Sequence, residues 1–125
     1  MGITNYRDLE VWQKAMTLVV MCYKVTERFP KTEMYGLSCQ LQRAAVSVPA
    51  NIAEGQGRSH TREYIHHLAI ARGSLLETET HLQIAERLGY IDKPSLPPLL
   101  DRTAEVGRML NGLMQALNRK LAARP

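Results

Sequence analysis

Hydrophobic residues recur every three or four positions along most of the chain, which is the period of one face of an α-helix. Breaks at Phe29-Pro30, Gly55-Gln-Gly57 and Gly89 divide this pattern into segments. No segment alternates with the period of a β-strand. We therefore predict a single all-α domain over residues 1–125, an antiparallel up-down-up-down four-helix bundle whose helices cover about 8–28, 33–55, 60–88 and 96–120.

One apolar stripe on each segment is assigned to the core of the bundle. The stripes are Leu9, Trp12, Met16, Val19, Tyr23 and Thr26; Met34, Leu37, Leu41, Ala44, Ala45, Val48 and Ile52; Tyr64, Leu68, Ala71, Leu75, Thr78, Leu82 and Ala85; and Leu99, Thr103, Val106, Leu110, Leu113 and Leu117.

The first and third segments carry further apolar residues away from these stripes. A monomeric bundle needs only one stripe per helix, and a large exposed apolar patch favours association. We therefore predict that copies of the chain associate, and the alternative is that kinks and tilts bury both stripes within one chain. The predicted interface residues are Val11, Leu18, Val25, Ile70, Ile84 and Leu88.

Residues that favour helix ends stand at three boundaries. Thr32 and Ser95 are expected to cap the second and fourth helices through their hydroxyl oxygens. Gly89 is expected to end the third helix in a left-handed conformation. Pro49 lies inside the second helix, where it removes a backbone donor and favours a kink.

Residues 43–57 combine small side chains with a polar pair that packing alone does not require. Asn51 and Glu54 lie off the apolar stripe, on the side shared by Arg43 and Ser47. We predict that a polar network between helices or between subunits fixes the register of the assembly. Its residues are Arg43, Asn51, Glu54, Ser74 and Glu77. The alternative is local capping, in which Asn51 and Glu54 bond the nearby backbone.

Several motifs together resemble one protein family, over about residues 6 to 91. They are Tyr6-Arg-Asp-Leu-Glu-Val-Trp12, Phe29-Pro30, Tyr35-Gly-Leu37, Gln40-Leu-Gln-Arg-Ala-Ala45, Ser47-Val-Pro-Ala-Asn-Ile-Ala-Glu-Gly55 and Ala71-Arg-Gly-Ser-Leu-Leu-Glu-Thr-Glu79. The chain resembles the four-helix-bundle proteins of the 23S rRNA intervening sequence, or S23, family, whose function is unknown. A related group is the accessory variability determinant of diversity-generating retroelements, a basic pentamer that works with a reverse transcriptase. The resemblance implies a ring-shaped homopentamer, with RNA, DNA or a reverse transcriptase as partners.

The formal net charge is +4, and the basic excess lies near the two ends of the chain. The topology makes the first and last helices neighbours, so their cations predict a surface that binds phosphate backbones with little sequence preference. The predicted contacts are Arg7, Lys14, Arg102, Arg108, Arg119, Lys120 and Arg124. The alternative is an ordinary solvated surface.

The residues give little support to catalysis. A di-iron bundle needs two Glu-x-x-His pairs that point inward, whereas Glu63-Tyr-Ile-His66 is a single pair that points away from the core stripe. Neither a nucleophile elbow nor a phosphate-binding glycine loop is present. We interpret Cys22 and Cys39 as buried free thiols. We therefore expect no cofactor and no metal.

Three functions remain open. The first is a non-enzymatic homo-oligomer that binds RNA or DNA, the second is a protein-interaction scaffold without a nucleic-acid role, and the third and weakest is a metalloenzyme. The expected location is the cytoplasm, without a membrane partner, because no signal peptide or spanning segment is visible.

Overall fold

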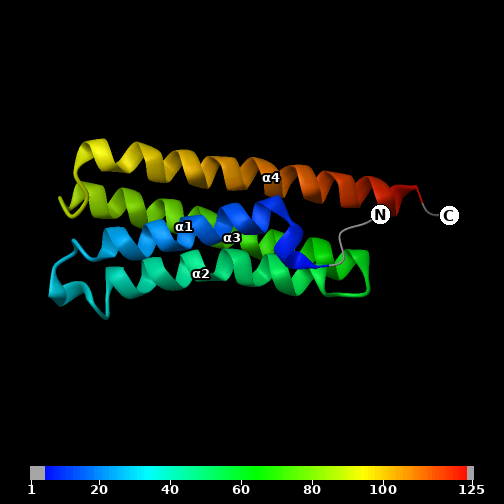
Figure 1. Cartoon of the computed structure of the whole chain (residues 1–125), viewed down its shortest axis with the longest axis horizontal. Coiled ribbons are helices and arrows are strands. Elements are labelled where there is room, and N and C mark those ends of the chain that lie inside the picture. Colours follow the sequence, from blue (N-terminus) through cyan, green and yellow to red (C-terminus); the bar gives the residue numbers. More distant parts are fainter. Residues whose placement is uncertain (1–4, 124–125) are drawn as a thin grey trace.

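A computed structural model describes residues 5–123 of the chain. The described part contains four long helices and three short 3₁₀ helices, with no strand (Figure 1). In chain order the elements are η1 Tyr6–Asp8, α1 Glu10–Thr26, η2 Lys31–Glu33, α2 Leu37–Gln56, α3 Thr61–Arg87, η3 Lys93–Ser95 and α4 Leu96–Ala122.

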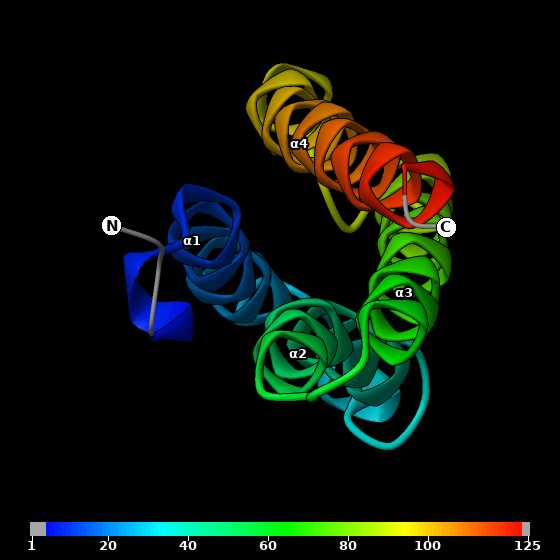
Figure 2. The same cartoon turned by 90° about the vertical axis from the view of Figure 1, so that its right-hand side faces the viewer.

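The four long helices form the predicted antiparallel bundle. Successive helices run in opposite directions along the long axis (Figure 1). Viewed along that axis they follow one another around the bundle, and α4 also packs against α1 (Figure 2). The start of α1 and the end of α4 therefore lie at the same end of the molecule. The prediction of an up-down-up-down four-helix bundle is confirmed.

The core residues of the first segment are only partly the ones predicted. Val11, Leu18 and Val25 are buried within the chain, and Leu18 is fully buried, whereas Met16 is 40% exposed and Tyr23 is 45% exposed. Of the predicted core stripe, Leu9 and Thr26 are buried, and Trp12 and Val19 pack partly buried against the core. The prediction that Val11, Leu18 and Val25 form an exposed interface is wrong. The physical reason is continuity: together with Ala15 and Cys22, these residues make an unbroken row of small and aliphatic side chains that fits the narrow centre of the bundle.

The predicted stripes of the other three helices largely form the core. Leu41, Val48 and Ile52 of α2 are fully buried, as are Leu68 and Leu82 of α3. On α4 the buried residues are Leu99, Thr103, Val106, Leu110 and Met114. Met34 is an exception because it lies before α2 and is exposed.

Two of the three predicted caps are wrong. Thr32 lies in η2, and the backbone N–H of Leu37 at the start of α2 donates instead to Glu33 Oε1, 3.0 Å away. The second oxygen of Glu33 accepts a 3.0 Å hydrogen bond from the Tyr90 hydroxyl, which ties the start of α2 to the loop after α3. Ser95 lies at the N-cap position of α4 but makes no capping hydrogen bond: its oxygen accepts from Arg28 Nη1 at 3.2 Å, and its hydroxyl donates to Asp92 Oδ1 at 2.7 Å. At the start of α2, the Glu33 carboxylate takes the place of the expected hydroxyl.

Gly89 ends α3 as predicted. Its φ of 80° places it in the left-handed region, and the N–H of Tyr90 donates to the carbonyl of Ala85 at 2.9 Å. This geometry closes the helix end and turns the chain so that Ile91 is buried under it.

Candidate functional site

A chain of hydrogen bonds joins α2 to α3 at the polar motif. The Ser74 hydroxyl lies 2.8 Å from Ser47 Oγ, and Asn51 Nδ2 donates to the same oxygen at 3.0 Å and to the Ser47 carbonyl at 2.9 Å. Asn51 Oδ1 lies 3.3 Å from His67 Nδ1. Because the amide nitrogen of Asn51 is the donor toward Ser47, its oxygen accepts, and the proton of a neutral His67 is assigned to Nδ1. We call these four side chains the α2–α3 seam.

The structure joins only some of the expected network residues. Asn51 and Ser74 meet through Ser47, as members of the α2–α3 seam. Glu54 pairs instead with Arg58, just beyond the end of α2, at 2.7 Å. Arg43 and Glu77 line a surface hollow of about 440 Å³ beside the seam, together with Gln40, Ala44, Ser47 and Ser74.

Gly55 allows α2 and α3 to come close at the end of this seam. A Cβ atom at this position would lie 2.9 Å from His67 Cβ and 3.0 Å from Tyr64 Cδ1. The conspicuous motif of residues 51–55 therefore has a packing explanation: Asn51 bonds across the helices, Ile52 fills the core and Gly55 leaves room for α3.

Replacing Asn51 by Ala tests the contribution of the α2–α3 seam to stability. The change removes the partner of His67 Nδ1 and one donor to Ser47, and we expect the free energy of unfolding to fall by about 1–3 kcal/mol in urea titrations. Gln40→Ala, an exposed polar change on the same helix, is the control and should stay within about 0.5 kcal/mol of the parent. Equal effects of the two changes would exclude a stabilising seam.

The half of α4 that follows Glu105 carries cations and no further carboxylate, and Arg108, one turn after Glu105, contributes to the positive charge around that carboxyl. From Val106 to Ala123 the helix contains Arg108, Arg119 and Lys120 and no acidic residue. Arg108, Asn111, Gln115 and Arg119 are exposed and lie three and four positions apart, on one helix face. This row is about 16 Å long at the rise of an α-helix.

Arg72 extends the same surface onto α3. Its Nη1 donates to Asn111 Oδ1 across the two helices at 3.1 Å, and both side chains are exposed. We call Arg72, Arg108, Asn111, Gln115 and Arg119 the α4 stripe. Sequence patterns did not bring Arg72 into the predicted set, because only the fold places it beside α4.

Two of the predicted nucleic-acid contacts are already engaged within the chain. Lys14 Nζ lies 3.0 Å from Glu105 Oε2, and Arg102 Nη1 lies 3.4 Å from Glu105 Oε1. The hydrogen bond from Lys14, followed by the positive charges around it, holds the pKa of the Glu105 carboxyl below its ordinary value. A phosphate would have to compete with this carboxylate for Lys14 and Arg102.

Arg108 also contributes positive charge near Glu105, whereas Arg7 lies in η1 and Arg119 and Lys120 lie in the last turn of α4. Arg7 is exposed in η1, with its guanidinium carbon 5.0 Å from the centre of the Tyr6 ring. It shares an end of the bundle with Arg119 and Lys120 (Figure 1). Arg124 lies outside the described residues.

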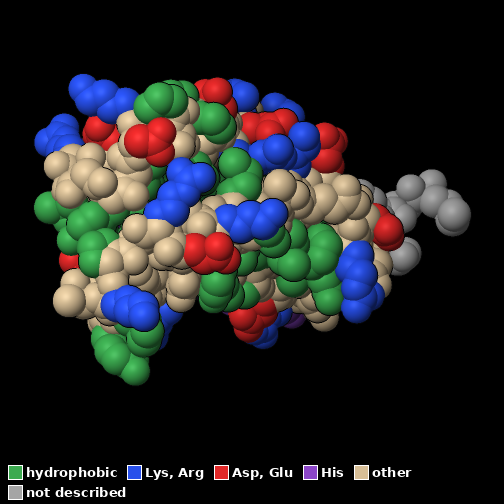
Figure 3. Space-filling view, turned by 60° about the vertical axis from the view of Figure 1, so that its left-hand side comes forward, with side chains coloured by type: hydrophobic (Ala, Val, Ile, Leu, Met, Phe, Trp, Pro, Cys, Tyr) green, Lys and Arg blue, Asp and Glu red, His purple; other side chains and the backbone are tan. Residues whose placement is uncertain are grey.

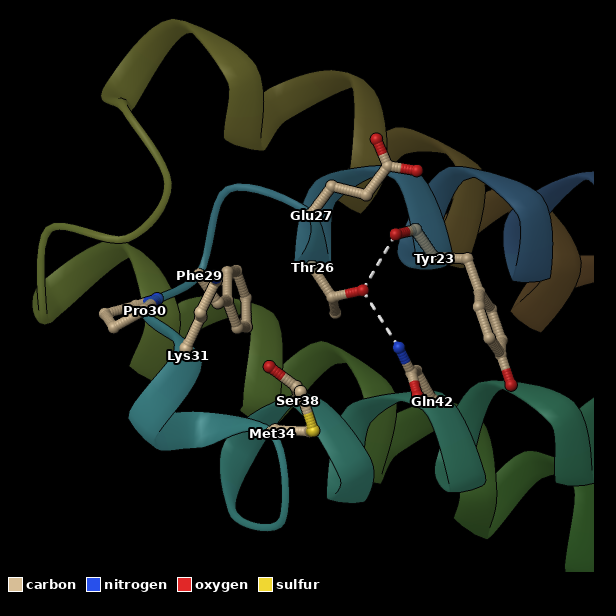
Figure 4. A pocket seen from close by; sticks show the side chains of 9 residues that line it. All are labelled: Tyr23, Thr26, Glu27, Phe29, Pro30, Lys31, Met34, Ser38 and Gln42. Atoms are coloured by element: carbon tan, nitrogen blue, oxygen red, sulfur yellow. Dashed lines mark hydrogen bonds between the residues drawn. The ribbon is translucent and has the colours of Figure 1, made fainter.

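A second hollow, of about 340 Å³, opens where α1 ends and α2 begins (Figure 4). Gln42 Nε2 donates to Thr26 Oγ1 at 3.0 Å, and the Thr26 hydroxyl lies 2.7 Å from the carbonyl of Tyr23. The Tyr23 ring extends from α1 toward α2 beside Gln42 (Figure 4). The hydrogen bonds thus fix one wall of the hollow and leave its other side chains open to a ligand.

Residues 5–123 contain few side chains placed to bind a metal ion or act as a nucleophile. No group of three or more His, Cys, Asp or Glu side chains in this range could hold a metal ion. Burial raises the pKa of the Cys22 thiol to about 12, so this thiol is not a nucleophile at neutral pH. Within the same range, no helix is long and apolar enough to cross a membrane.

Comparison with known proteins finds one matching family and a similar solved structure. The sequence model of one family, described as 23S rRNA-intervening sequence protein, matches residues 7–112. A similar crystal structure, at 1.70 Å resolution, is that of a protein of unknown function from the S23 ribosomal protein family of Bacteroides thetaiotaomicron. It is 24% identical, covers 83% of this chain and 97% of its own, and superposes with a TM-score of 0.75. No curated protein matches the chain.

Proposed function

The chain belongs to the 23S rRNA-intervening sequence protein family, and from this premise we propose that it is a non-enzymatic, self-associating helical bundle that binds nucleic acid through the α4 stripe. The observation that carries the proposal is the half of α4 that follows Glu105. It presents arginines and amides on its outer side and contains no carboxylate. The positive charges of such a surface attract the negatively charged phosphate backbone of a nucleic acid.

The composition of the α4 stripe favours backbone contacts over base reading. Three guanidinium groups supply forked donors that match phosphate oxygens, and two amides supply neutral hydrogen bonds. The stripe contains no aromatic side chain on which a base could stack. Binding should therefore depend steeply on salt and weakly on sequence. Arg119 and Lys120 have an additional role, because their positive charges complement the negative end of the helix dipole at the C-terminus of α4.

Removing two arginines of the α4 stripe tests its role. We expect the Arg108→Ala/Arg119→Ala double variant to bind fluorescein-labelled RNA or DNA about tenfold more weakly at low salt, because two phosphate contacts are lost. Arg87→Ala/Lys93→Ala is the matched control, since it removes the same charge from exposed positions at the other end of the bundle. Fluorescence anisotropy measures both. Equal losses from the two pairs would show that net charge alone governs binding.

Self-association is assigned to the outer side of α3. Ile70, Ile84 and Leu88 are between 39% and 54% exposed, and covering them would remove apolar surface from water. The family resemblance favours a pentamer among the possible assemblies. With Val11, Leu18 and Val25 buried in the core, these three residues are what remains of the interface predicted from the sequence.

Introducing a charge on this side of α3 tests the assembly. Ile84→Glu places a carboxylate in the proposed interface, and we expect it to shift the mass toward the monomer at micromolar concentration. Leu76→Glu, at another exposed apolar position of the same helix, should leave the mass unchanged. Light scattering behind size exclusion gives both masses. A parent protein that is monomeric throughout would contradict the assignment.

A further inference from the structure

The bundle exposes apolar side chains on two helices that lie diagonally across it. On α1, three large apolar residues between 40% and 52% exposed follow one another at spacings of four and three, so they share one helix face. The outer side of α3 carries the other group, which is assigned above to copies of the chain. Since α2 and α4 separate α1 from α3, the two groups face different sides of the molecule (Figure 2). We call Met16, Val20 and Tyr23 the α1 row, and Ile70, Ile84 and Leu88 the α3 row.

Glu77 opposes a contact of the α3 row with the α3 row of another copy. Ile70, Glu77 and Ile84 are spaced by seven residues, so they lie nearly on one line along the helix. The Glu77 side chain is 67% exposed. A two-fold contact across the middle of the α3 row would bring the Glu77 carboxylates of both copies together. Because like charges oppose association, a different surface is the better partner for the α3 row.

Lys24 and Glu77 carry opposite charges that are not paired with Lys, Arg, Asp or Glu side chains of residues 5–123. Lys24 is exposed beside the α1 row, one turn after Val20. The carboxylate of Glu77 lies 3.9 Å from His81 Nε2, which is beyond hydrogen-bond distance. Arg43 borders the same hollow as Glu77 without forming an ion pair. An α1 row placed on the α3 row would therefore bring a cation to an unpaired carboxylate.

The two rows lie at overlapping heights along the bundle. Thr26 of α1 is bonded to Gln42 of α2, and Ser74 of α3 is bonded to Ser47, five positions further along α2. At the rise of an α-helix, Ser74 is about 8 Å below Thr26 along the axis, level with the α1 row. Because α1 and α3 run in the same direction (Figure 1), copies placed side by side with parallel axes bring the rows together without an axial shift.

The charges around the α1 row are of both signs. Lys24 and Glu27, which flank its end, balance each other. Hydrophobic side chains reach the surface between positive and negative ones on the face shown in Figure 3. A field of one sign therefore does not keep a second copy away from this face, and local complementarity decides what packs on it.

We propose that the α1 row of one copy packs against the α3 row of the next copy, with Lys24 beside Glu77. This inference rests on the self-association proposed above and names the surface that covers the outer side of α3. Each copy then uses two different surfaces, and a head-to-tail contact of this kind repeats from copy to copy until it closes a ring. The rows share no residue with the α4 stripe.

Mixing two variants tests the head-to-tail contact. Val20→Glu disables the α1 row and Ile84→Glu disables the α3 row, so we expect each variant alone to be monomeric in light scattering behind size exclusion. An equal mixture still contains one intact α1 row and one intact α3 row, on different chains. Its mass should therefore rise to that of a dimer over a concentration series. A mixture that stays monomeric throughout the series overturns the proposal.

Thr17→Glu is the matched control on α1. It adds the same charge at an exposed position that borders a different hollow, with Lys14 and Arg102, and should keep the mass of the parent. Circular dichroism verifies that all variants stay folded. A monomeric parent contradicts the self-association itself, whereas an assembled parent whose mass Val20→Glu leaves unchanged overturns only the pairing of the two rows.

Reversing the proposed ion pair tests its register. Lys24→Glu should weaken association by about tenfold, because it sets a carboxylate against Glu77 of the next copy. The double variant Lys24→Glu/Glu77→Lys restores opposite charges and should recover the association of the parent. Equal weakening by the single and double variants would show that Lys24 does not face Glu77.

Discussion

Leu18→Ala is expected to lower the free energy of unfolding by about 2–5 kcal/mol, in the range of buried leucine truncations. Leu18 is fully buried in the centre of the bundle, so the change removes apolar contacts and leaves a cavity that four packed helices cannot close. Urea titration followed by circular dichroism measures the change. The expected loss is a large fraction of the stability of a domain of this size.

Met16→Ala is the matched comparison, because Met16 lies two residues away on the same helix and is 40% exposed. Its truncation should cost less than about 1 kcal/mol. The contrast between the two variants tests which side of α1 faces the core. A larger loss for Met16→Ala than for Leu18→Ala would restore the core predicted from the sequence and contradict the helix orientation described above.

Gly55→Ala is expected to destabilise the bundle, although alanine favours a helix more than glycine does. The added Cβ would lie 2.9 Å from His67 Cβ and 3.2 Å from the backbone oxygen of Tyr64. Neither is the end of a flexible side chain, so α2 and α3 must move apart. Overpacking of this kind costs about 1–3 kcal/mol, and the loss should appear as a lower melting temperature and urea midpoint.

Gly73→Ala is expected to stabilise the same bundle. An added Cβ at Gly73 meets nothing within 4 Å, so the gain in helix propensity, about 1 kcal/mol, is not offset. Opposite signs for the two substitutions would establish that Gly55 is required by helix contact. Stabilisation by both would mean that the helices are less closely packed at Gly55 than the structure shows.

Periodicity predicted most of the fold because one apolar stripe dominates α2, α3 and α4. Leu41, Val48 and Ile52 stand at helical spacing without a competing stripe, so their burial follows from the pattern alone. On α1 two stripes of similar strength compete. The prediction took the stripe with Trp12 and Tyr23 as the core, whereas Val11, Leu18 and Val25 are the more fully buried residues. Only the packing of the other helices decides between them.

The contacts of the candidate site could not be predicted from the sequence as well as the fold could. Asn51 and His67 are separated by 16 positions, and Arg72 and Asn111 by 39, so no local spacing links either pair. The polar character of Asn51 was visible, whereas its partner across the helices was not. The run without carboxylates after Glu105 was a usable signal for the α4 stripe, and it could have separated Arg119 from the paired Lys14 and Arg102.

The proposed roles divide the surface of the bundle among different partners. The outer side of α3 is assigned to copies of the chain and the α4 stripe to nucleic acid. Since these surfaces do not share a residue, a substitution in one should leave binding at the others unchanged.

The salt dependence of nucleic-acid binding by the parent protein tests the central claim most directly. Labelled single-stranded RNA is titrated with the full chain at several salt concentrations, and the logarithm of the association constant is plotted against that of the salt concentration. Engagement of the three arginines of the α4 stripe by phosphates predicts a slope of about −2. A slope near zero, or no binding at low salt, would contradict a nucleic-acid role for the α4 stripe.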